Sequence, residues 1–284
     1  MANPKQRLPG NAPGEFYVDA TCIDCDQCRQ IAPAVFHAEG DFSVVHRQPT
    51  TPEDALRAEM ALLTCPTASI GTEGKRDLAR ALSAYPEVVS EGVHFCGFAS
   101  KDSFGASSYL IVRPEGNVLV DSPRFAEPLV RRIEALGGVR WMFLTHRDDV
   151  ADHAQFRRRF GCERILHEAD ADFPVERPIR GGEPARIGAD LLVIPTPGHT
   201  EGHHVLLYRD TYLFTGDHLW WSPERRALHA SRSVCWYSWP EQRRSVERLL
   251  DHRFGWVLPG HGARHRAPPE EMHRLLRRLV AAME

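Results

Sequence analysis

The spacing of apolar and polar positions predicts two different kinds of structure along the chain. In the first part it predicts a hairpin over residues 35–45, turning at Glu39-Gly40-Asp41, and a helix from Thr51-Pro52 to Cys65-Pro66. Threonine can cap this helix and proline can occupy its first turn, whereas the residue before a proline rarely continues a helix. From residue 93 onward, short β-rich runs alternate with helical periodicity.

These patterns divide the chain into four regions. The expected strands of the last region are 108–112, 118–121, 141–145, 164–167, 191–196, 204–208, 212–215 and 256–259, and its expected helices are 126–136, 150–160, 240–252 and 268–283. Residues 1–14 are polar and rich in proline and glycine, which is typical of a flexible arm. The charged stretch 73–92 has no strand alternation and is predicted to be a linker between domains at 15–72 and 93–284.

Composition excludes some classes of function. The 284 residues have a net charge of −3 with acids and bases interspersed, so bulk charge predicts neither nucleic-acid nor membrane binding. The N-terminus has no apolar segment and no run of about 18 apolar residues occurs, so we expect a soluble, cytoplasmic protein. Seven cysteines, an odd number, favour metal-bound thiolates in a reducing compartment over a disulfide framework.

Four of the cysteines have the spacing of iron–sulfur ligands. Cys22, Cys25 and Cys28 form C-x2-C-x2-C, and Cys65 follows in a Cys-Pro step. A tight loop can supply three corners of a cluster and a distant cysteine the fourth, which predicts one [4Fe–4S] cluster. The alternatives are a zinc knuckle, although zinc usually takes two cysteine pairs, or free thiols. Cys96, Cys162 and Cys235 are expected to be small buried apolar residues.

The stretch 15–71 resembles one-cluster bacterial ferredoxins. The resemblance lies in YVDATCIDCDQCRQIAPAVF and LLTCPTASI. It implies a small ferredoxin-like domain that holds the cluster.

Metal-ligand residues follow four apolar strands of the last region. The segments are HRDDVADH from His146, GHTEGHH from Gly198, GDH from Gly216 and GHG from Gly260. Strand ends that deliver His and Asp through glycine-rich turns place ligands rigidly at one edge of a sheet. Imidazole and carboxylate together suit zinc, iron or manganese. A single histidine would more often be structural, but four such segments in succession predict a metal site.

The order of these segments resembles the metallo-β-lactamase superfamily, especially its glyoxalase II-like branch. The family pattern is T-H-x-H-x-D-H, G-H-T-x-G-H, T-G-D and G-H, and the likeness covers 93–265, including the strands SFGASSYLIV and NVLVDSPRF. The resemblance implies an α+β chain, a ferredoxin-like domain followed by an αββα sandwich with two divalent metal ions at one edge. It implies metal one on His146, His199 and Asp217, and metal two on Asp152, His153, His261 and the bridging Asp217. Asp152 and Asp217 would be the catalytic carboxylates.

The first segment departs from the family pattern. It is two residues longer and lacks the second histidine, whose place by position is taken by Asp148, although Asp149 could reach instead. A carboxylate at this place favours iron or manganese over zinc. His203, His204 and His218 are interpreted as structural or supporting residues.

Several aromatic residues follow Asp217, and the resemblance places them near the metal cleft. Trp220, Trp221, Trp236 and Tyr237 would then wall a substrate pocket; packing in the core is the alternative.

Three functions are compatible with these features. The first is a hydrolase of a small thioester, ester or lactam, in which a hydroxide shared by the two metals is the nucleophile. The second is an oxidoreductase whose cluster passes electrons, supplied by a redox partner protein, to a di-iron centre. The third is a non-catalytic redox sensor or electron carrier. The motifs favour the hydrolase.

Overall fold

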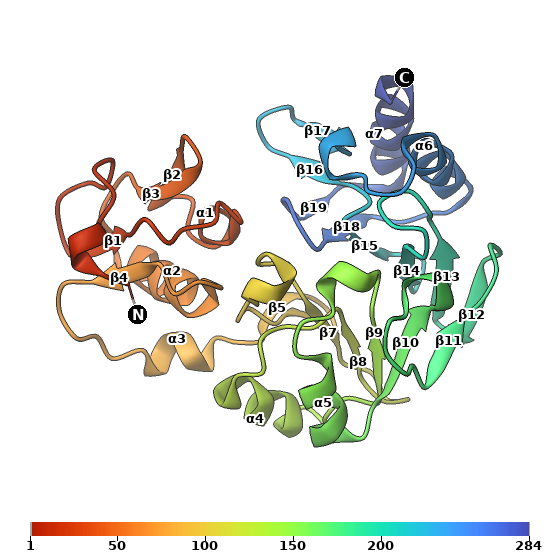
Figure 1. The fold of residues 1–284 in the computed structure, drawn as a ribbon, viewed down its shortest axis with the longest axis horizontal. Coiled ribbons are helices and arrows are strands. Elements are labelled where there is room, and N and C mark those ends of the chain that lie inside the picture. The colour runs from red at the N-terminus through yellow and green to blue at the C-terminus, as the bar shows by residue number, and fades with distance from the viewer. Residues whose placement is uncertain (1, 284) are drawn as a thin grey trace. The chain divides into compact units, whose positions relative to one another are not determined.

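The computed structural model describes residues 2–283 and contains two compact units (Figure 1). The first unit is Met1–Arg140 with Ala151–Cys162, and the second is Trp141–Val150 with Glu163–Glu284. Each unit is described separately below. Within the described residues, no helix combines the length and the apolar character that crossing a membrane requires.

The beginning of the first unit has the predicted hairpin and helix. Its elements are η1 (Pro4–Gln6), β1 (Phe16–Val18), α1 (Gln27–Ile31), β2 (Phe36–Glu39), β3 (Phe42–Val45), α2 (Pro52–Thr64) and β4 (Ile70–Thr72). Strands β2 and β3 pair antiparallel, as do β1 and β4. The side chain of Thr51 accepts a hydrogen bond from the Asp54 N–H at 3.0 Å, which confirms the predicted cap of α2.

The stretch 1–14, expected as a flexible arm, makes specific contacts within its described residues 2–14. Asn11 is buried, and its amide donates to the Val18 carbonyl while its side-chain oxygen accepts from the N–H groups of Val18 and Val45. A buried amide with these partners ties the segment to β1 and β3.

The remainder of the first unit is an antiparallel sheet with three helices. It contains α3 (Ala79–Ser83), β5 (Glu87–Ser90), β6 (Val93–Phe95), η2 (Lys101–Ser103), β7 (Tyr109–Ile111), β8 (Val118–Val120), α4 (Glu127–Ala135) and α5 (His153–Phe160). Strands β5 to β8 pair in chain order. The expected linker 73–92 therefore includes a helix and a strand. Strand β5 lies at the edge of its sheet and pairs with β6 through an irregular register. Such a short edge strand shows no clear alternation of polarity.

The second unit contains three parallel strands and a six-stranded sheet. The parallel strands are β9 (Trp141–Phe143), β10 (Glu163–His167) and β11 (Arg177–Ile179), with η3 (Arg147–Asp149) and η4 (Glu168–Asp170) between them. The larger sheet has the order β12 (Ala185–Gly188), β13 (Leu191–Pro195), β14 (His204–Tyr208), β15 (Tyr212–Gly216), β18 (Trp256–Pro259) and β19 (His265–Arg266). A separate hairpin is formed by β16 (Trp220–Ser222) and β17 (Ala227–His229).

Helices α6 (Trp239–Arg248) and α7 (Pro269–Ala282) lie side by side in the second unit and pack on the larger sheet (Figure 1). Short 3-10 turns, η5 (Arg232–Val234) and η6 (Leu249–Asp251), flank α6. The shared core includes Val205, Leu213 and Val257 from the sheet and Val246 and Leu276 from the helices, each nearly inaccessible to solvent. Burial of this apolar surface holds the helices on the sheet.

The direction of the strands brings three of the predicted segments to one edge. Strands β13 and β15 are both antiparallel to β14, and β15 is parallel to β18, so the three end at the same edge. The His204 N–H donates to the Thr145 carbonyl at 3.0 Å, which brings the residues after β9 to the start of β14 and hence to this edge. The fourth segment therefore joins the other three.

Candidate functional site

Six potential ligands gather where these strands end. His146 follows β9, Asp148 and Asp149 lie on η3, and His199, Asp217 and His261 follow β13, β15 and β18. All six except Asp148 and His261 are almost completely buried. The sequence expectation that these four segments converge agrees with the geometry.

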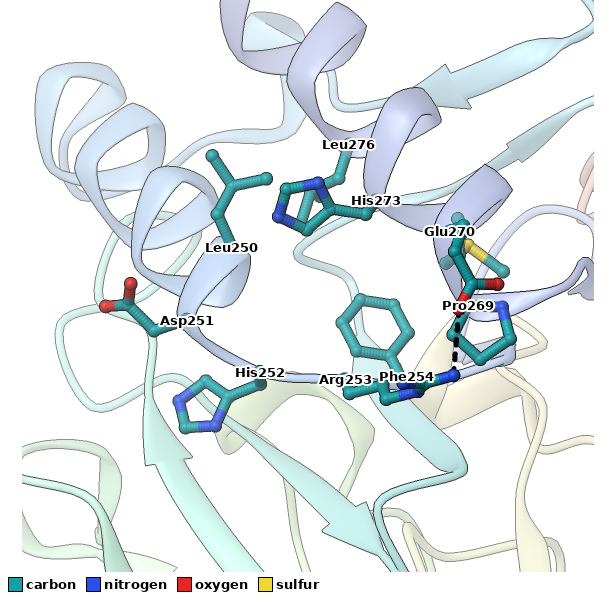
Figure 2. Close-up of a pocket in the computed structure, with 10 residues that line it drawn as sticks. Leu250, Asp251, His252, Arg253, Phe254, Pro269, Glu270, His273 and Leu276 are labelled. Atoms are coloured by element: carbon teal, nitrogen blue, oxygen red, sulfur yellow. Dashed lines mark hydrogen bonds and ion pairs between the residues drawn. The ribbon is translucent and has the colours of Figure 1, made fainter.

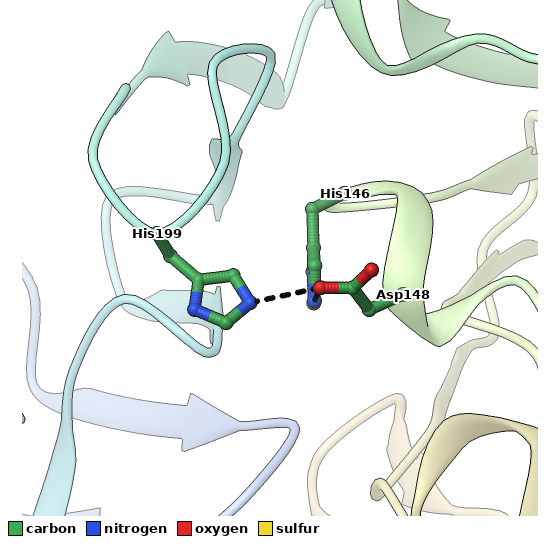
Figure 3. Close-up of side chains that lie close together, drawn as sticks. All are labelled: His146, Asp148 and His199. Atoms are coloured by element: carbon green, nitrogen blue, oxygen red, sulfur yellow. Dashed lines mark ion pairs between the residues drawn. The ribbon is translucent and has the colours of Figure 1, made fainter. Parts of the chain in front are cut away.

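One group of donors consists of His146, Asp148 and His199, with one atom from each lying within 4.8 Å of the others. Nε2 of His199 is 3.3 Å from Oδ2 of Asp148, and Nε2 of His146 is 3.9 Å from the same oxygen. Figure 3 shows both rings directed at this carboxylate, which stands where the family pattern has a histidine.

A second group consists of His146, Asp149 and Asp217, again with donor atoms within 4.8 Å of one another. Nδ1 of His261 is 2.8 Å from each carboxylate oxygen of Asp217. A Cβ at position 260 would meet Oδ2 of Asp149 at 2.6 Å and Oδ1 of Asp217 at 2.9 Å. Glycine at this position therefore leaves the space in which the two carboxylates approach each other.

The charges of the site are set by burial and by the neighbouring rings. Burial raises the pKa of Asp217, but His261, His146 and His199 together lower it further, so the net shift is well below the usual range. The His199 ring beside it lowers the pKa of Asp148. Burial lowers the pKa of His146 to about 4. Ionised carboxylates beside a neutral imidazole are the protonation states that bind a metal ion.

Hydrogen bonds select the ring nitrogens that face the carboxylates. His199 donates through Nδ1–H to the Val234 carbonyl at 2.5 Å, and Nδ1 of His146 lies 2.9 Å from the Thr145 hydroxyl. The Nε2 atoms of both rings are buried and have no hydrogen-bond partner within residues 2–283. A cation between these nitrogens and the carboxylates would satisfy them, so the donor set fits a metal ion.

Neither donor group found among residues 2–283 includes Asp152 or His153, and their assignment as ligands of the second metal stays a prediction. The Asp152 carboxylate accepts hydrogen bonds from the Phe125 N–H at 2.7 Å and from the Gln155 amide at 2.6 Å. His153 is the first residue of α5. The 3-10 turn η3, which directly follows His146, places Asp149 in the second donor group, three residues after His146.

The histidines interpreted as supporting residues are fully buried. Burial lowers the pKa of His204 to about 4, that of His218 to about 3 and that of His203 well below its ordinary value. Nδ1 of His203 is 2.9 Å from the Thr196 hydroxyl, and the His203 and His218 rings stack at 5.3 Å. None belongs to either donor group found among residues 2–283.

Asp170 is a site residue that sequence reasoning missed. This buried carboxylate accepts from the Thr200 hydroxyl at 2.5 Å, from the Gly202 N–H at 2.8 Å and from the Arg147 N–H at 3.2 Å. It therefore joins the turn after His146 to the loop that carries His199. The only signal in the sequence was an acidic residue following strand β10, which does not reveal these partners.

The aromatic residues divide into two sets. Trp236 and Tyr237 are exposed by 61% and 51%, and the Trp236 ring lies 6.1 Å from the His199 ring. Their segment is anchored because the Trp236 N–H donates to the His199 carbonyl at 2.9 Å. Trp221 stacks on His265 at 3.7 Å and packs against the core, and Trp220 contacts His229 edge to face. Trp236 and Tyr237 are thus exposed, whereas Trp221 is a packing residue, and the expected pocket wall stays a prediction.

A separate hollow of the second unit lies between η6 and the start of α7 (Figure 2). Its lining includes Leu250, His252, Phe254, Glu270 and His273, and Arg253 forms an ion pair with Glu270 across its rim. None of the six converging residues lines this hollow.

The four predicted cluster cysteines, Cys22, Cys25, Cys28 and Cys65, line one cavity of the first unit together with Val18, Ile23 and Ile70. Sγ of Cys65 accepts from the Ser69 N–H at 3.3 Å, and Sγ of Cys22 accepts from the Ser43 N–H at 3.5 Å. Burial raises the pKa of Cys25 to about 12, which is the penalty that an iron centre would offset on binding the thiolate. Four sulfurs around one cavity, two of them with N–H donors, fit an iron–sulfur cluster.

The other cysteines behave differently from one another. Cys96 and Cys162 are buried, as expected. Cys235 is only partly buried, and its thiol donates to the Gly198 carbonyl at 3.1 Å.

Comparison with known proteins identifies the parts of the chain. Residues 18–72 match the family described as the 4Fe-4S single cluster domain of Ferredoxin I. A hydroxyacylglutathione hydrolase of Rhodospirillum rubrum is 33% identical over 138 residues, which are 46% of this chain and 54% of the relative. A second, of Acidiphilium cryptum, is 31% identical over 118 residues, or 39% of this chain and 48% of the relative. The chain thus spans about half the length of these curated relatives.

Solved structures identify the fold of the larger part. DIM-1 metallo-β-lactamase superposes with a TM-score of 0.53 at 18% identity, covering 70% of this chain and 96% of that protein. BLEG-1 B3 metallo-β-lactamase superposes with a TM-score of 0.50 at 17% identity, covering 61% and 93%. The larger part of the chain has the metallo-β-lactamase fold. The predicted α+β architecture, a ferredoxin-like domain followed by a metallo-β-lactamase fold, is therefore confirmed.

Proposed function

We propose that the protein is a metal-dependent hydrolase acting on a thioester or ester. The observation that carries the proposal is the convergence of three histidines and three carboxylates at one strand edge, with buried Nε2 atoms of His146 and His199 directed at carboxylates. The two relatives named hydroxyacylglutathione hydrolase support the same chemistry.

The donor set suggests which residues hold each ion. His146, Asp148 and His199 would hold one divalent metal, Asp149 and His261 the other, and Asp217 would lie between both. When bound, two divalent ions supply a nucleophile at neutral pH and polarise the substrate carbonyl. Val234 and Thr145 keep the ring nitrogens of His199 and His146 in the orientation that this binding needs.

The substrate side of the proposal rests on Trp236 and Tyr237. The exposed Trp236 ring lies 6.1 Å from the His199 ring, and the exposed Tyr237 follows it in the chain. The apolar acyl group of a small-molecule substrate would contact these rings while its carbonyl approaches the metal ligands.

The experiment uses anaerobically purified protein loaded with zinc, manganese or iron. Hydrolysis is measured for S-lactoylglutathione, an arylacetyl thioester, an aryl ester, a lactone and a β-lactam, for the native chain and for Asp217→Asn. We expect metal-dependent turnover of at least one thioester or ester and its loss in the variant. If no compound is hydrolysed with any of the three metals, the hydrolase proposal fails.

A redox enzyme is the second candidate, and the oxygen-rich ligand set favours it. Three carboxylates among six donors shift preference toward iron or manganese, and residues 18–72 match a 4Fe-4S domain that could pass electrons from a redox partner. Metal analysis with iron spectroscopy separates the candidates. Two zinc ions per chain, in addition to the iron of the cluster, would favour hydrolysis. A coupled di-iron signal would favour redox chemistry.

A further inference from the structure

The C-terminal end of helix α2 is bound by residues that lie outside the matched ferredoxin region. The Ala99 N–H donates to the Thr64 carbonyl at 3.1 Å, and Nη2 of Arg124 donates to the Leu63 carbonyl at 2.8 Å. The last carbonyl groups of a helix have no partner within the helix. Ala99 and Arg124 therefore complete the end of the helix that immediately precedes the cluster ligand Cys65.

A tyrosine from outside the same region reinforces this end. The buried Tyr85 hydroxyl donates to the Met60 carbonyl at 3.1 Å and lies 2.7 Å from the Thr64 hydroxyl. Because the hydroxyl is inaccessible to water, losing these contacts would leave buried polar groups unsatisfied. The position of α2, and with it Cys65, thus depends on residues beyond 72.

The loop at 100–107 comes close to the side chains of Cys25 and Pro66. A Cβ at Gly105 would lie 2.6 Å from Cβ and 2.9 Å from Sγ of Cys25, and 3.2 Å from Pro66. Gly105 has φ +86°, a conformation that favours glycine. Its N–H donates to the Ser100 carbonyl at 2.8 Å, which fixes the turn.

A side-chain hydrogen bond links this loop to the cysteine motif itself. Gln27, between Cys25 and Cys28, is 2% exposed and donates through Nε2 to the Ser107 hydroxyl at 2.9 Å. The motif thus contacts the loop at two positions, through the close approach of Gly105 to Cys25 and the hydrogen bond of Gln27 to Ser107.

We propose that residues 99–107 and Arg124 are a functional part of the iron–sulfur site. Gly105 forms the wall against Cys25, Ser107 positions the motif through Gln27, and Ala99 and Arg124 fix the helix end that presents Cys65. None of these positioning residues lies in the region 18–72. The inference rests on the assignment of a [4Fe–4S] cluster and is independent of the hydrolase proposal.

This arrangement has a consequence for solvent access and redox potential. Gly105 lies against the partly buried Cys25 side chain, and the exposure of a cluster to solvent is one of the factors that set its potential. Opening the wall or loosening Cys65 should therefore shift the potential and shorten the life of the cluster in air.

The test uses the full chain, reconstituted anaerobically with iron and sulfide. Variants Arg124→Met, Ser107→Ala and Gly105→Ala are compared for iron and sulfide per chain, decay of the visible absorption in air, and midpoint potential. We expect cluster retention about tenfold poorer in Arg124→Met and Gly105→Ala, in line with residues that orient metal ligands, and a smaller loss in Ser107→Ala.

Matched controls separate this effect from general destabilisation. Arg131→Met removes an arginine that is 72% exposed and paired with Glu127 on α4. Gly161→Ala places alanine at φ +65° in open space, so it has the backbone strain of Gly105→Ala without the contact with Cys25. Both controls should keep the native cluster content and lifetime.

The proposal is overturned if Arg124→Met and Ser107→Ala keep native cluster content, air stability and potential. It is equally overturned if Gly105→Ala loses no more cluster than Gly161→Ala. Circular dichroism verifies the fold of each variant, and Ser107→Ala, the mildest change, decides the outcome should Gly105→Ala not fold.

Discussion

Asp149 and Asp217 place carboxylate oxygens within 4.8 Å of each other and of a ring nitrogen of His146. Both residues are buried, and the glycine at 260 leaves room for their approach. Two ionised carboxylates at such a distance in a poorly solvated site repel each other unless a cation lies between them. We therefore propose Asp149 as a ligand of the second metal, three residues before the aspartate that the family pattern suggests.

The first prediction compares Asp149→Asn with Asp152→Asn. Removing the Asp149 charge should lower bound divalent metal by about one ion per chain and reduce hydrolysis by at least about a hundredfold, because a ligand is lost. Asp152→Asn should keep both metals and lose only stability, since the Asp152 carboxylate accepts from Phe125 and Gln155. Metal analysis after dialysis and thermal unfolding provide the measurements.

The opposite result would restore the ligand set implied by the family pattern. Metal lost from Asp152→Asn but retained by Asp149→Asn would exclude Asp149 as a ligand. The pair is well matched, because both substitutions exchange one carboxylate for an amide in the same short segment.

The sequence predicted which segments of the chain converge at the site, but it could not predict which aspartate of the first segment faces the other ligands. Strand order and Gly-rich turns predicted that His146, His199, Asp217 and His261 converge, since ligand segments after strands that run the same way meet at one edge. The choice among Asp148, Asp149 and Asp152 depends on the turn after His146, a 3-10 turn that no periodicity reveals. Asp170 was missed for a related reason, because its partners Thr200 and Gly202 lie about 30 residues away.

The fold shows the same division. Strands with long buried apolar runs, such as β13 and β14, were predicted within one residue of their ends. The edge strand β5 and the short strand β19 were not, because few residues and mixed burial leave no periodic signal.

The second prediction concerns Asp170. In Asp170→Asn the amide NH2 must face one of three donors, from Arg147, Thr200 and Gly202, so we expect a loss of about 1–3 kcal/mol in stability. Because both ligand-bearing turns would shift, metal affinity should fall about tenfold or more. Urea unfolding and metal titration measure the two effects.

Asp172→Asn is the control for this substitution. Asp172 is exposed, so its amide should leave both stability and metal affinity at their native values. Equal behaviour of the two variants would show that Asp170 does not organise the site.

The third prediction concerns Trp236. Trp236→Ala should raise KM for an arylacetyl thioester about three- to tenfold, the range expected for losing one aromatic contact, and leave KM for an acetyl thioester nearly unchanged. Metal content should stay native because the His199 contact uses the Trp236 backbone N–H. Steady-state kinetics with the two thioesters measure the difference.

Val88→Ala is a control for unspecific apolar binding, because Val88 on β5 is 68% exposed. A KM for the aryl substrate that rises as much in Val88→Ala, or in neither variant, would contradict a substrate contact at Trp236.

The fourth prediction is that the metal-free protein loses stability as pH falls from about 6.5. Burial lowers the pKa of His204 to about 4 in the folded chain, and the ordinary value of 6.5 applies once it is unfolded. Between these two values the unfolded state binds more protons than the folded state, so the free energy of unfolding rises with pH. The contribution of His204 is fully present above 6.5 and is lost on the way down to about 4.

His204→Phe isolates this contribution. One histidine contributes a slope of at most about 1.4 kcal/mol per pH unit inside the window, and the variant should lack that part of the slope even though its stability at neutral pH changes. Urea unfolding between pH 4.5 and 7.5, in the presence of chelator, measures the slope. The control is His37→Gln, which replaces a half-exposed histidine side chain. A slope in His204→Phe equal to that of the native chain would mean that His204 is protonated in the folded state, and the neutral imidazole inferred from its burial would be wrong.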